Sequence, residues 1–137
     1  MVHLIKLSVG VRDLEHLREV QAARAAVAPL RHVTRSFPRR AEEIVAAGSI
    51  YWVVGGLLLA RQRVVDIVAE RREDGTPCTA LMLDPALVPV APRPVRAFQG
   101  WRYLEAEAAP ADLEAGAGAG EGMPARLRAE LMVLGLL

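Results

Sequence analysis

The sequence predicts an α+β domain with two helices near the N-terminus, a mostly antiparallel and strongly twisted sheet or partial β-barrel, and a C-terminal helix. The chain of 137 residues has the length of one ordinary domain. Its 53% of hydrophobic and 24% of charged residues are typical of a globular protein. Two turn signals, Gly55-Gly56 and Asp74-Gly75, divide a region rich in β-branched residues into segments of strand length. Such segments predict antiparallel hairpins.

The N-terminal part predicts one strand and then a helix. Residues 2–9 are mainly apolar and are followed by Gly10, as expected for a buried strand. Asp13 stands where a helix N-cap or first-turn acid belongs, and the helix is expected to reach about residue 27. Two polar residues, Gln21 and Arg24, fall inside the apolar stripe of this helix. A local violation of a pattern often marks a functional site, although a structural ion pair explains it equally well.

The middle of the chain predicts a second helix and a β-meander. Pro38 is suited to the first turn of this helix, and Gly48 to the position just after its end. The prolines within residues 85–94 predict an extended connector. The predicted strands of the meander and its return are residues 50–54, 57–70, 76–83 and 98–104.

Composition predicts where the single domain ends. The α+β domain is expected to cover residues 1–114, and the Gly/Ala-rich residues 115–123 are typical of a flexible linker. Residues 124–137 predict an amphipathic helix that is too short to be stable alone in water. We therefore expect this helix to dock on its own domain or on a second subunit, and we favour a homodimer.

Charge and cysteine content restrict the class of protein. Seventeen basic and sixteen acidic residues give a net charge of +1, although residues 1–72 carry +5 and residues 73–137 carry −4. A single cysteine excludes an internal disulfide framework and fits the cytoplasm. The N-terminus lacks the pattern of a secretory signal. The uncharged residues 44–60 reach the lower length limit of a membrane span, but glycines and β-branched residues favour a turn and strands, so no membrane is predicted.

No enzyme class emerges from the reactive residues. His3, His16 and His32 have no metal-ligand spacing, so neither a metal nor another cofactor is predicted. Cys78 lies within an apolar strand, where a buried and inert thiol is expected. The sequence contains no nucleophile motif or phosphate-binding glycine loop, and no catalytic residue is predicted.

Arginines and aromatic residues offer a binding hypothesis instead. Residues 31–40 are basic and free of acids, which suits either contacts to phosphate or a solvated loop. Five of the six aromatic residues fall in two short stretches, which suits either one small core or a half-exposed shelf that stacks on a base. Arg61 and Arg63 fall on an apparent core face of a strand, which requires a bulge or a polar cleft. The candidate ligand-binding residues are Arg24, Arg31, Arg35, Arg39, Arg40, Arg61, Arg63, Trp52, Trp101 and Tyr103.

Three short segments carry a resemblance to known proteins. They are GSIYWV at residues 48–53, RQR at 61–63 and FQGWRYL at 98–104. Together they resemble a family of small, uncharacterised bacterial proteins over roughly residues 1–115. The resemblance implies one domain and no assigned activity. A weaker, fold-level similarity to PUA-like domains, small twisted barrels that often bind RNA or modified bases, transfers no residue roles.

The leading functional hypothesis is a non-enzymatic cytoplasmic binding module for RNA or a nucleotide, in which the arginines contact phosphate and the aromatic side chains stack. The alternative is a protein-interaction or homo-oligomeric module that uses the C-terminal helix and the aromatic residues. An enzyme that holds an anionic small molecule between Arg24, Arg61 and Arg63 is the third hypothesis.

Overall fold

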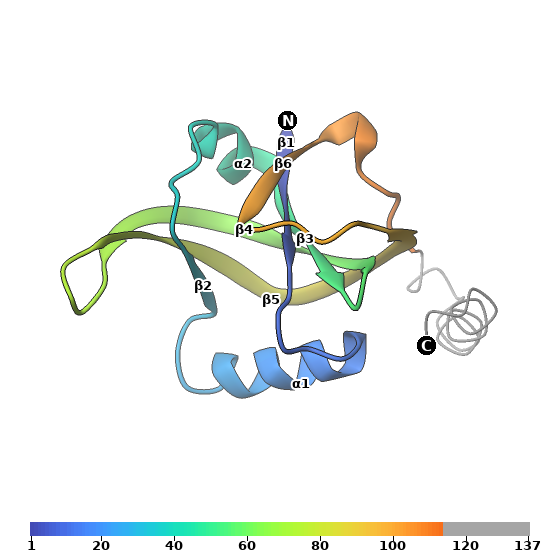
Figure 1. Cartoon of the computed structure of the whole chain (residues 1–137), viewed down its shortest axis with the longest axis horizontal. Coiled ribbons are helices and arrows are strands. Elements are labelled where there is room, and N and C mark those ends of the chain that lie inside the picture. Colours follow the sequence, from blue (N-terminus) through green and yellow to red (C-terminus); the bar gives the residue numbers. More distant parts are fainter. Residues whose placement is uncertain (114–137) are drawn as a thin grey trace.

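The computed structural model describes residues 1–113, which form a six-stranded mixed sheet with two short helices (Figure 1). The order of strands across the sheet is β2-β5-β4-β3-β1-β6. The strands are β1 (Val2–Leu7), β2 (Arg31–Thr34), β3 (Ser49–Val54), β4 (Leu57–Arg71), β5 (Pro77–Pro94) and β6 (Trp101–Glu105). The helices are α1 (Leu14–Ala25) and α2 (Ala41–Ala47), and the short 3-10 helix η1 (Ala106–Ala108) follows β6.

The predicted fold class is wrong, because the sheet is mixed and contains a parallel pair, β1 and β3, next to the edge strand β6. Strand β1 pairs in parallel with β3, with Leu4 opposite Ile50, and antiparallel with β6, with Leu4 opposite Tyr103. The chain between β1 and β3 passes through α1, β2 and α2, which is long enough for the crossover that a parallel pair requires. Local turn signals predict hairpins but carry no information on so distant a pairing. The predicted linker at residues 115–123 and helix at 124–137 lie outside the described residues.

The proline-rich stretch is a strand and not the predicted connector. Strand β5 pairs with β4 along most of its length, and Pro89 lies opposite Ala60. Strand β2 covers only Thr79 to Met82 on the other side of β5. On this side the proline-rich half of β5 meets only an isolated bridge between Val90 and Asp112, so prolines without an N–H interrupt no continuous ladder there. Several register shifts between β4 and β5 also mark bulges, which accommodate the irregular backbone.

The predicted hairpin between β3 and β4 is present. Gly55 and Gly56 have φ angles of 58° and 84°, which is the left-handed region that tight hairpin turns use. Strand β3 is buried along its whole length, which explains its continuous apolar sequence. Ile50 belongs to the larger core, beneath α1 and α2, and Tyr51 to a smaller core on the opposite face.

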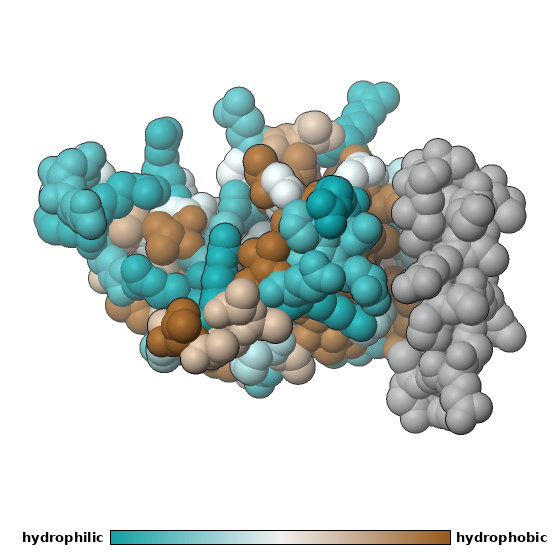
Figure 2. All heavy atoms as spheres, turned by 90° about the horizontal axis from the view of Figure 1, so that it is seen from below, coloured by the Kyte–Doolittle hydropathy of each residue, from teal (hydrophilic) through white to brown (hydrophobic). Residues whose placement is uncertain are grey.

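Both helices pack against the larger core, with α2 at the top and α1 at the bottom of the view in Figure 1. The Asp13 side chain accepts a 2.8 Å hydrogen bond from the His16 N–H and caps α1 as predicted. Leu17 of α1 and Ile44 of α2 are both buried in this core. Seen from the side of α1, hydrophilic side chains gather at the tip of the β4–β5 hairpin (Figure 2).

Residues 44–60, which are long enough to suggest a membrane span, are divided between α2, β3 and the start of β4. No helix within residues 1–113 has the length and hydropathy needed to cross a membrane.

Candidate functional site

An open cleft of about 920 Å³ lies between β1, β6 and the segment that joins β2 to α2. We call it the basic cleft, because four cationic side chains and no carboxylate of the described residues line it. Its cationic residues are Lys6, Arg35, Arg39 and Arg72, and its aromatic residues are Phe37, Trp101 and Tyr103. The cleft thus joins a positive potential to aromatic rings, which are the two features that phosphate and base contacts require.

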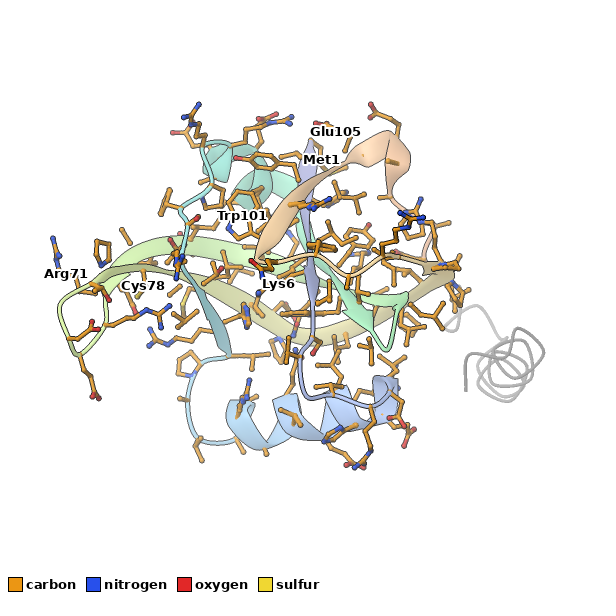
Figure 3. All side chains as sticks on the ribbon, in the orientation of Figure 1. Met1, Lys6, Arg71, Cys78, Trp101 and Glu105 are labelled. Carbon is orange, nitrogen blue, oxygen red and sulfur yellow. The ribbon has the colours of Figure 1, made fainter. Side chains whose placement is uncertain are left out.

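Hydrogen bonds between distant segments hold the aromatic wall of the cleft. Trp101 lies opposite Lys6 in the β1–β6 register, and the two side chains lie side by side in Figure 3. The Trp101 indole N–H donates a 3.0 Å hydrogen bond to the carbonyl of Ser36. The Tyr103 hydroxyl accepts a 3.1 Å hydrogen bond from the Arg40 N–H. The Trp101 and Tyr103 rings meet edge to face, with centroids 5.0 Å apart. The wall is therefore fixed before any ligand arrives.

Within residues 1–113, the cationic side chains of the basic cleft have no direct polar partner, although the charge of Arg72 helps to lower the pKa of Asp74. None of the four makes a side-chain hydrogen bond or ion pair with another residue in the described part of the chain. Partial burial of Lys6 lowers the pKa of its ammonium group. Arg35 and Arg39 are exposed, and both were predicted to contact phosphate.

Arg40 supports the cleft and is already paired. It forms ion pairs of 2.6 Å with both Glu43 and Glu105, and its guanidinium lies 5.5 Å from the centre of the Tyr103 ring. Hydrogen bonds to Glu43 and Glu105 raise the pKa of Arg40, while the same contact with Arg40 lowers the pKa of Glu43. These contacts tie α2 to β6, so Arg40 positions the aromatic wall.

Arg31 and Arg61 are paired as well. Arg31 forms a 2.5 Å ion pair with Glu70 of β4. Arg61 forms a 2.6 Å ion pair with Asp112 and donates a 3.0 Å hydrogen bond to the Ser49 hydroxyl. The bond to Asp112 raises the pKa of Arg61 and lowers that of Asp112. This pair fastens the end of the described chain to the sheet.

Arg63 has a structural role at the end of α2. Its guanidinium donates hydrogen bonds to the carbonyls of Ile44, Val45, Gly48 and Val64. The last carbonyls of a helix have no partners within the helix, and Arg63 supplies partners for them. Arg61 and Arg63 line neither the basic cleft nor the pocket described next, so the structure does not unite them with Arg24.

A second and more enclosed pocket of about 260 Å³ lies between α1, β1 and β2. We call it the inner pocket. Its polar lining includes Lys6, Gln21, Arg24 and His32, and the Trp52 ring also contributes. Lys6 and Val33 line the basic cleft as well, so the two sites meet at these residues. Arg24 and Trp52 therefore belong to a different site from Arg35, Arg39, Trp101 and Tyr103.

A buried amide pair forms the polar side of the inner pocket. The Gln21 and Gln62 side chains exchange two hydrogen bonds of 2.9 and 2.7 Å. The Gln62 oxygen also accepts a 3.0 Å bond from the Trp52 indole N–H, and its nitrogen donates a 2.9 Å bond to the carbonyl of Asp84. The sequence marked Gln21 as a violation of the apolar stripe, but it did not indicate Gln62 as the partner.

His32 is the buried polar group without a partner. Within residues 1–113, its Nε2 is the buried side-chain nitrogen or oxygen atom that makes no hydrogen bond. Its ring lies edge to face on Trp52, with centroids 5.1 Å apart. Burial, together with the positive charges of Lys6 and Arg24, lowers the pKa of His32 to about 4. His32 is therefore neutral at pH 7.

We expect His32 to make the fold sensitive to acid. Its pKa is about 4 in the folded state and 6.5 unperturbed, so the free energy of unfolding is highest above pH 6.5 and decreases as the pH falls toward 4. The full loss is about 3 kcal/mol, at roughly 1.4 kcal/mol for each pKa unit. Urea unfolding across this pH range should show a smaller loss in His32→Phe, whereas His16→Phe should follow the unmodified protein. If the free energy of unfolding depended on pH in the same way in all three proteins, His32 would not be the cause of the acid sensitivity.

Within the described residues, no group of three or more His, Cys, Asp or Glu side chains is placed to hold a metal ion. Cys78 is buried. No curated protein and no solved structure matches the chain, so the similarity to PUA-like domains stays a prediction. The resemblance to a family without assigned function is confirmed: the chain belongs to the family described as "Protein of unknown function (DUF1489)", whose model matches residues 4–137.

Proposed function

We propose that the protein is a non-enzymatic module that binds single-stranded RNA or a nucleotide in the basic cleft. The observation that supports this function is the group of four uncommitted cations, Lys6, Arg35, Arg39 and Arg72, in one concave surface without a lining carboxylate. Arginine presents several N–H donors in a plane that matches phosphate oxygens. Three arginines and a lysine in one cleft can therefore bind several phosphate oxygens of one ligand.

The aromatic side chains of the cleft favour a ligand that also carries a base. Phe37 is 48% exposed, and Trp101 and Tyr103 are half-buried beside it in the same cleft. Stacking of a base on an aromatic ring contributes about 1–3 kcal/mol per base. Bases in a duplex are already stacked on each other, so such a wall suits a single strand or a free nucleotide.

We expect Arg35→Ala/Arg39→Ala/Arg72→Ala to weaken RNA binding at low salt by at least about tenfold. For the unmodified protein, log affinity should fall with log salt with a slope of about −3, because each of four phosphate contacts contributes roughly 0.7. With one cation left, the slope should be about −1. The measurement is fluorescence anisotropy of a labelled, mixed-sequence single-stranded RNA in a salt series, with a mononucleotide as competitor.

The matched control removes the same charge elsewhere. Arg12, Arg18 and Arg96 are exposed and lie outside the basic cleft, so their triple alanine variant should keep most of the affinity. A separate variant, Phe37→Ala, should weaken binding without changing the salt slope, because it removes a stacking surface and no charge. Absence of binding at low salt, or equal losses in the two triple variants, would refute the proposal.

A further inference from the structure

The inner pocket is lined by cationic residues, most of which do not take part in the proposed RNA binding in the basic cleft. Its cationic lining residues are Lys6, Arg24 and Arg31, and no carboxylate of the described residues lines it. Arg31 is committed to its ion pair with Glu70. Lys6 and Arg24 have no side-chain hydrogen bond or ion pair in the described part of the chain, which leaves two positive charges to attract an anion.

Arg24 lies on the side of α1 that faces the domain, where it lines the inner pocket. Arg24 lies four residues after Val20 on α1, on the stripe that an amphipathic helix turns toward its own domain. Val20 lines the same pocket, so Arg24 lies beside an apolar part of its wall. Lys6, Arg24 and His32 line the same pocket, and the two positive charges help to lower the pKa of His32.

The rest of the lining suits an apolar body. Leu17 and Leu30 are buried in the larger core and form part of the wall, together with Val11 and the Trp52 ring. The volume of about 260 Å³ corresponds to roughly nine water molecules at ~30 Å³ each. It therefore has room for one ring or a short chain with a polar head, and not for a polymer.

The floor of the pocket is organised before a ligand binds. The Trp52 indole N–H is held by Gln62, and Gln62 is held by Gln21, so neither side chain has to be reordered. His32 is the group in this lining whose buried Nε2 lacks a partner. An anionic oxygen in the pocket would supply an acceptor for this nitrogen when it carries the ring proton.

We propose that the inner pocket binds a small organic anion, one in which a single carboxylate or phosphate group is attached to an apolar ring or chain. The charged group lies between Lys6 and Arg24, and the apolar part contacts Trp52 and the leucines. The two sites share Lys6 and Val33 and no other lining residue, and the proposal does not require that the basic cleft binds RNA.

The test uses the full chain and four probes of similar shape. Benzoate and phenyl phosphate carry the required negative charge, benzamide is neutral, and benzamidine is positive. We expect titration calorimetry to detect both anions, with benzamide at least about tenfold weaker and benzamidine not bound. In NMR spectra, the anions should shift the resonances of the Trp52 indole and the His32 ring. Equal binding of benzamide and benzoate, or no binding of either anion, would overturn the proposal.

Variants separate this site from the basic cleft. Arg24→Ala should weaken benzoate binding at least about tenfold, and it should fold, because Arg24 is exposed and alanine is the best helix former. Arg18→Ala, on the same helix but outside the pocket, should leave the affinity unchanged. The Arg35→Ala/Arg39→Ala/Arg72→Ala variant should also bind benzoate normally. Loss of benzoate binding in that variant but not in Arg24→Ala would show that the anion occupies the basic cleft, and would overturn the proposal while leaving RNA binding intact.

Discussion

Replacement of Gln62 by leucine is expected to lower the free energy of unfolding by at least about 3 kcal/mol. Gln62 is fully buried and connects Gln21, the Trp52 indole N–H and the carbonyl of Asp84. Leucine has a similar volume, so the variant leaves no large cavity, but it leaves these groups without their partner. Each unsatisfied buried group costs about 1–3 kcal/mol, and the largest part of the loss comes from Gln21 and Trp52.

A double-mutant cycle measures this coupling. Gln21→Leu and Gln62→Leu should each destabilise the protein, but the double variant should lose less than the sum, because it removes both members of the amide pair. Urea denaturation gives the required free energies. Gln99→Leu, at an exposed position, should change stability by no more than about 0.5 kcal/mol. Additive losses in the cycle would show that the two amides do not depend on each other.

The second large effect is expected at Gly48, between α2 and β3. A Cβ atom there would collide with the carbonyl oxygens of Val2 and Ile44 and with the Ile44 Cα, which are all backbone atoms. Backbone cannot move aside as a flexible side chain can, so Gly48→Ala should cost at least about 2 kcal/mol. The φ angle of Gly48 is −87°, which other residues adopt readily, so the cost is steric.

Gly56→Ala provides the comparison for Gly48→Ala. Gly56 has a φ of 84°, but an added Cβ would meet no atom within 4 Å. Its substitution therefore tests backbone strain without collision and should cost about 1 kcal/mol. In thermal unfolding, the melting temperature of Gly48→Ala should be clearly lower than that of Gly56→Ala. The reverse order would mean that α2 and β1 separate easily and that their close approach is not needed for stability.

Local features of the fold were predictable from the sequence and distant pairings were not. The Gly55-Gly56 hairpin and the Asp13 cap depend on conformational preferences that each residue carries with it. The parallel pairing of Leu4 with Ile50 depends on where a long crossover returns the chain. A continuous apolar strand pairs equally well in either direction, so its sequence does not reveal its neighbours.

The basic cleft was predictable only in part for the same reason. Arg35, Arg39, Trp101 and Tyr103 stood out as acid-free or aromatic segments, and the structure places them in one cleft. Lys6 gave no signal, because a single lysine in a strand is unremarkable until its neighbours are known. Phe37 and Arg72 were likewise missed.

To predict the basic cleft, one would also have to know which arginines have partners in the fold and which do not. Arg31, Arg40, Arg61 and Arg63 resembled the others in sequence but have partners in the fold. An arginine is available to bind a ligand only if no acid or carbonyl group already pairs with it. The tertiary structure determines which of these groups lie next to it.

The position of β1 in the sheet has a consequence for how quickly the protein reaches its native state. Leu4 is paired on one side with Ile50 and on the other with Tyr103, so the first strand to be synthesised acquires its second neighbour from the last described strand. Pairings that span so much of the chain raise the contact order, and such domains fold in milliseconds to seconds. Until β6 arrives, one edge of an apolar strand stays open to pairing with other chains. Nascent chains that end before β6 are therefore the form of this protein most prone to aggregate.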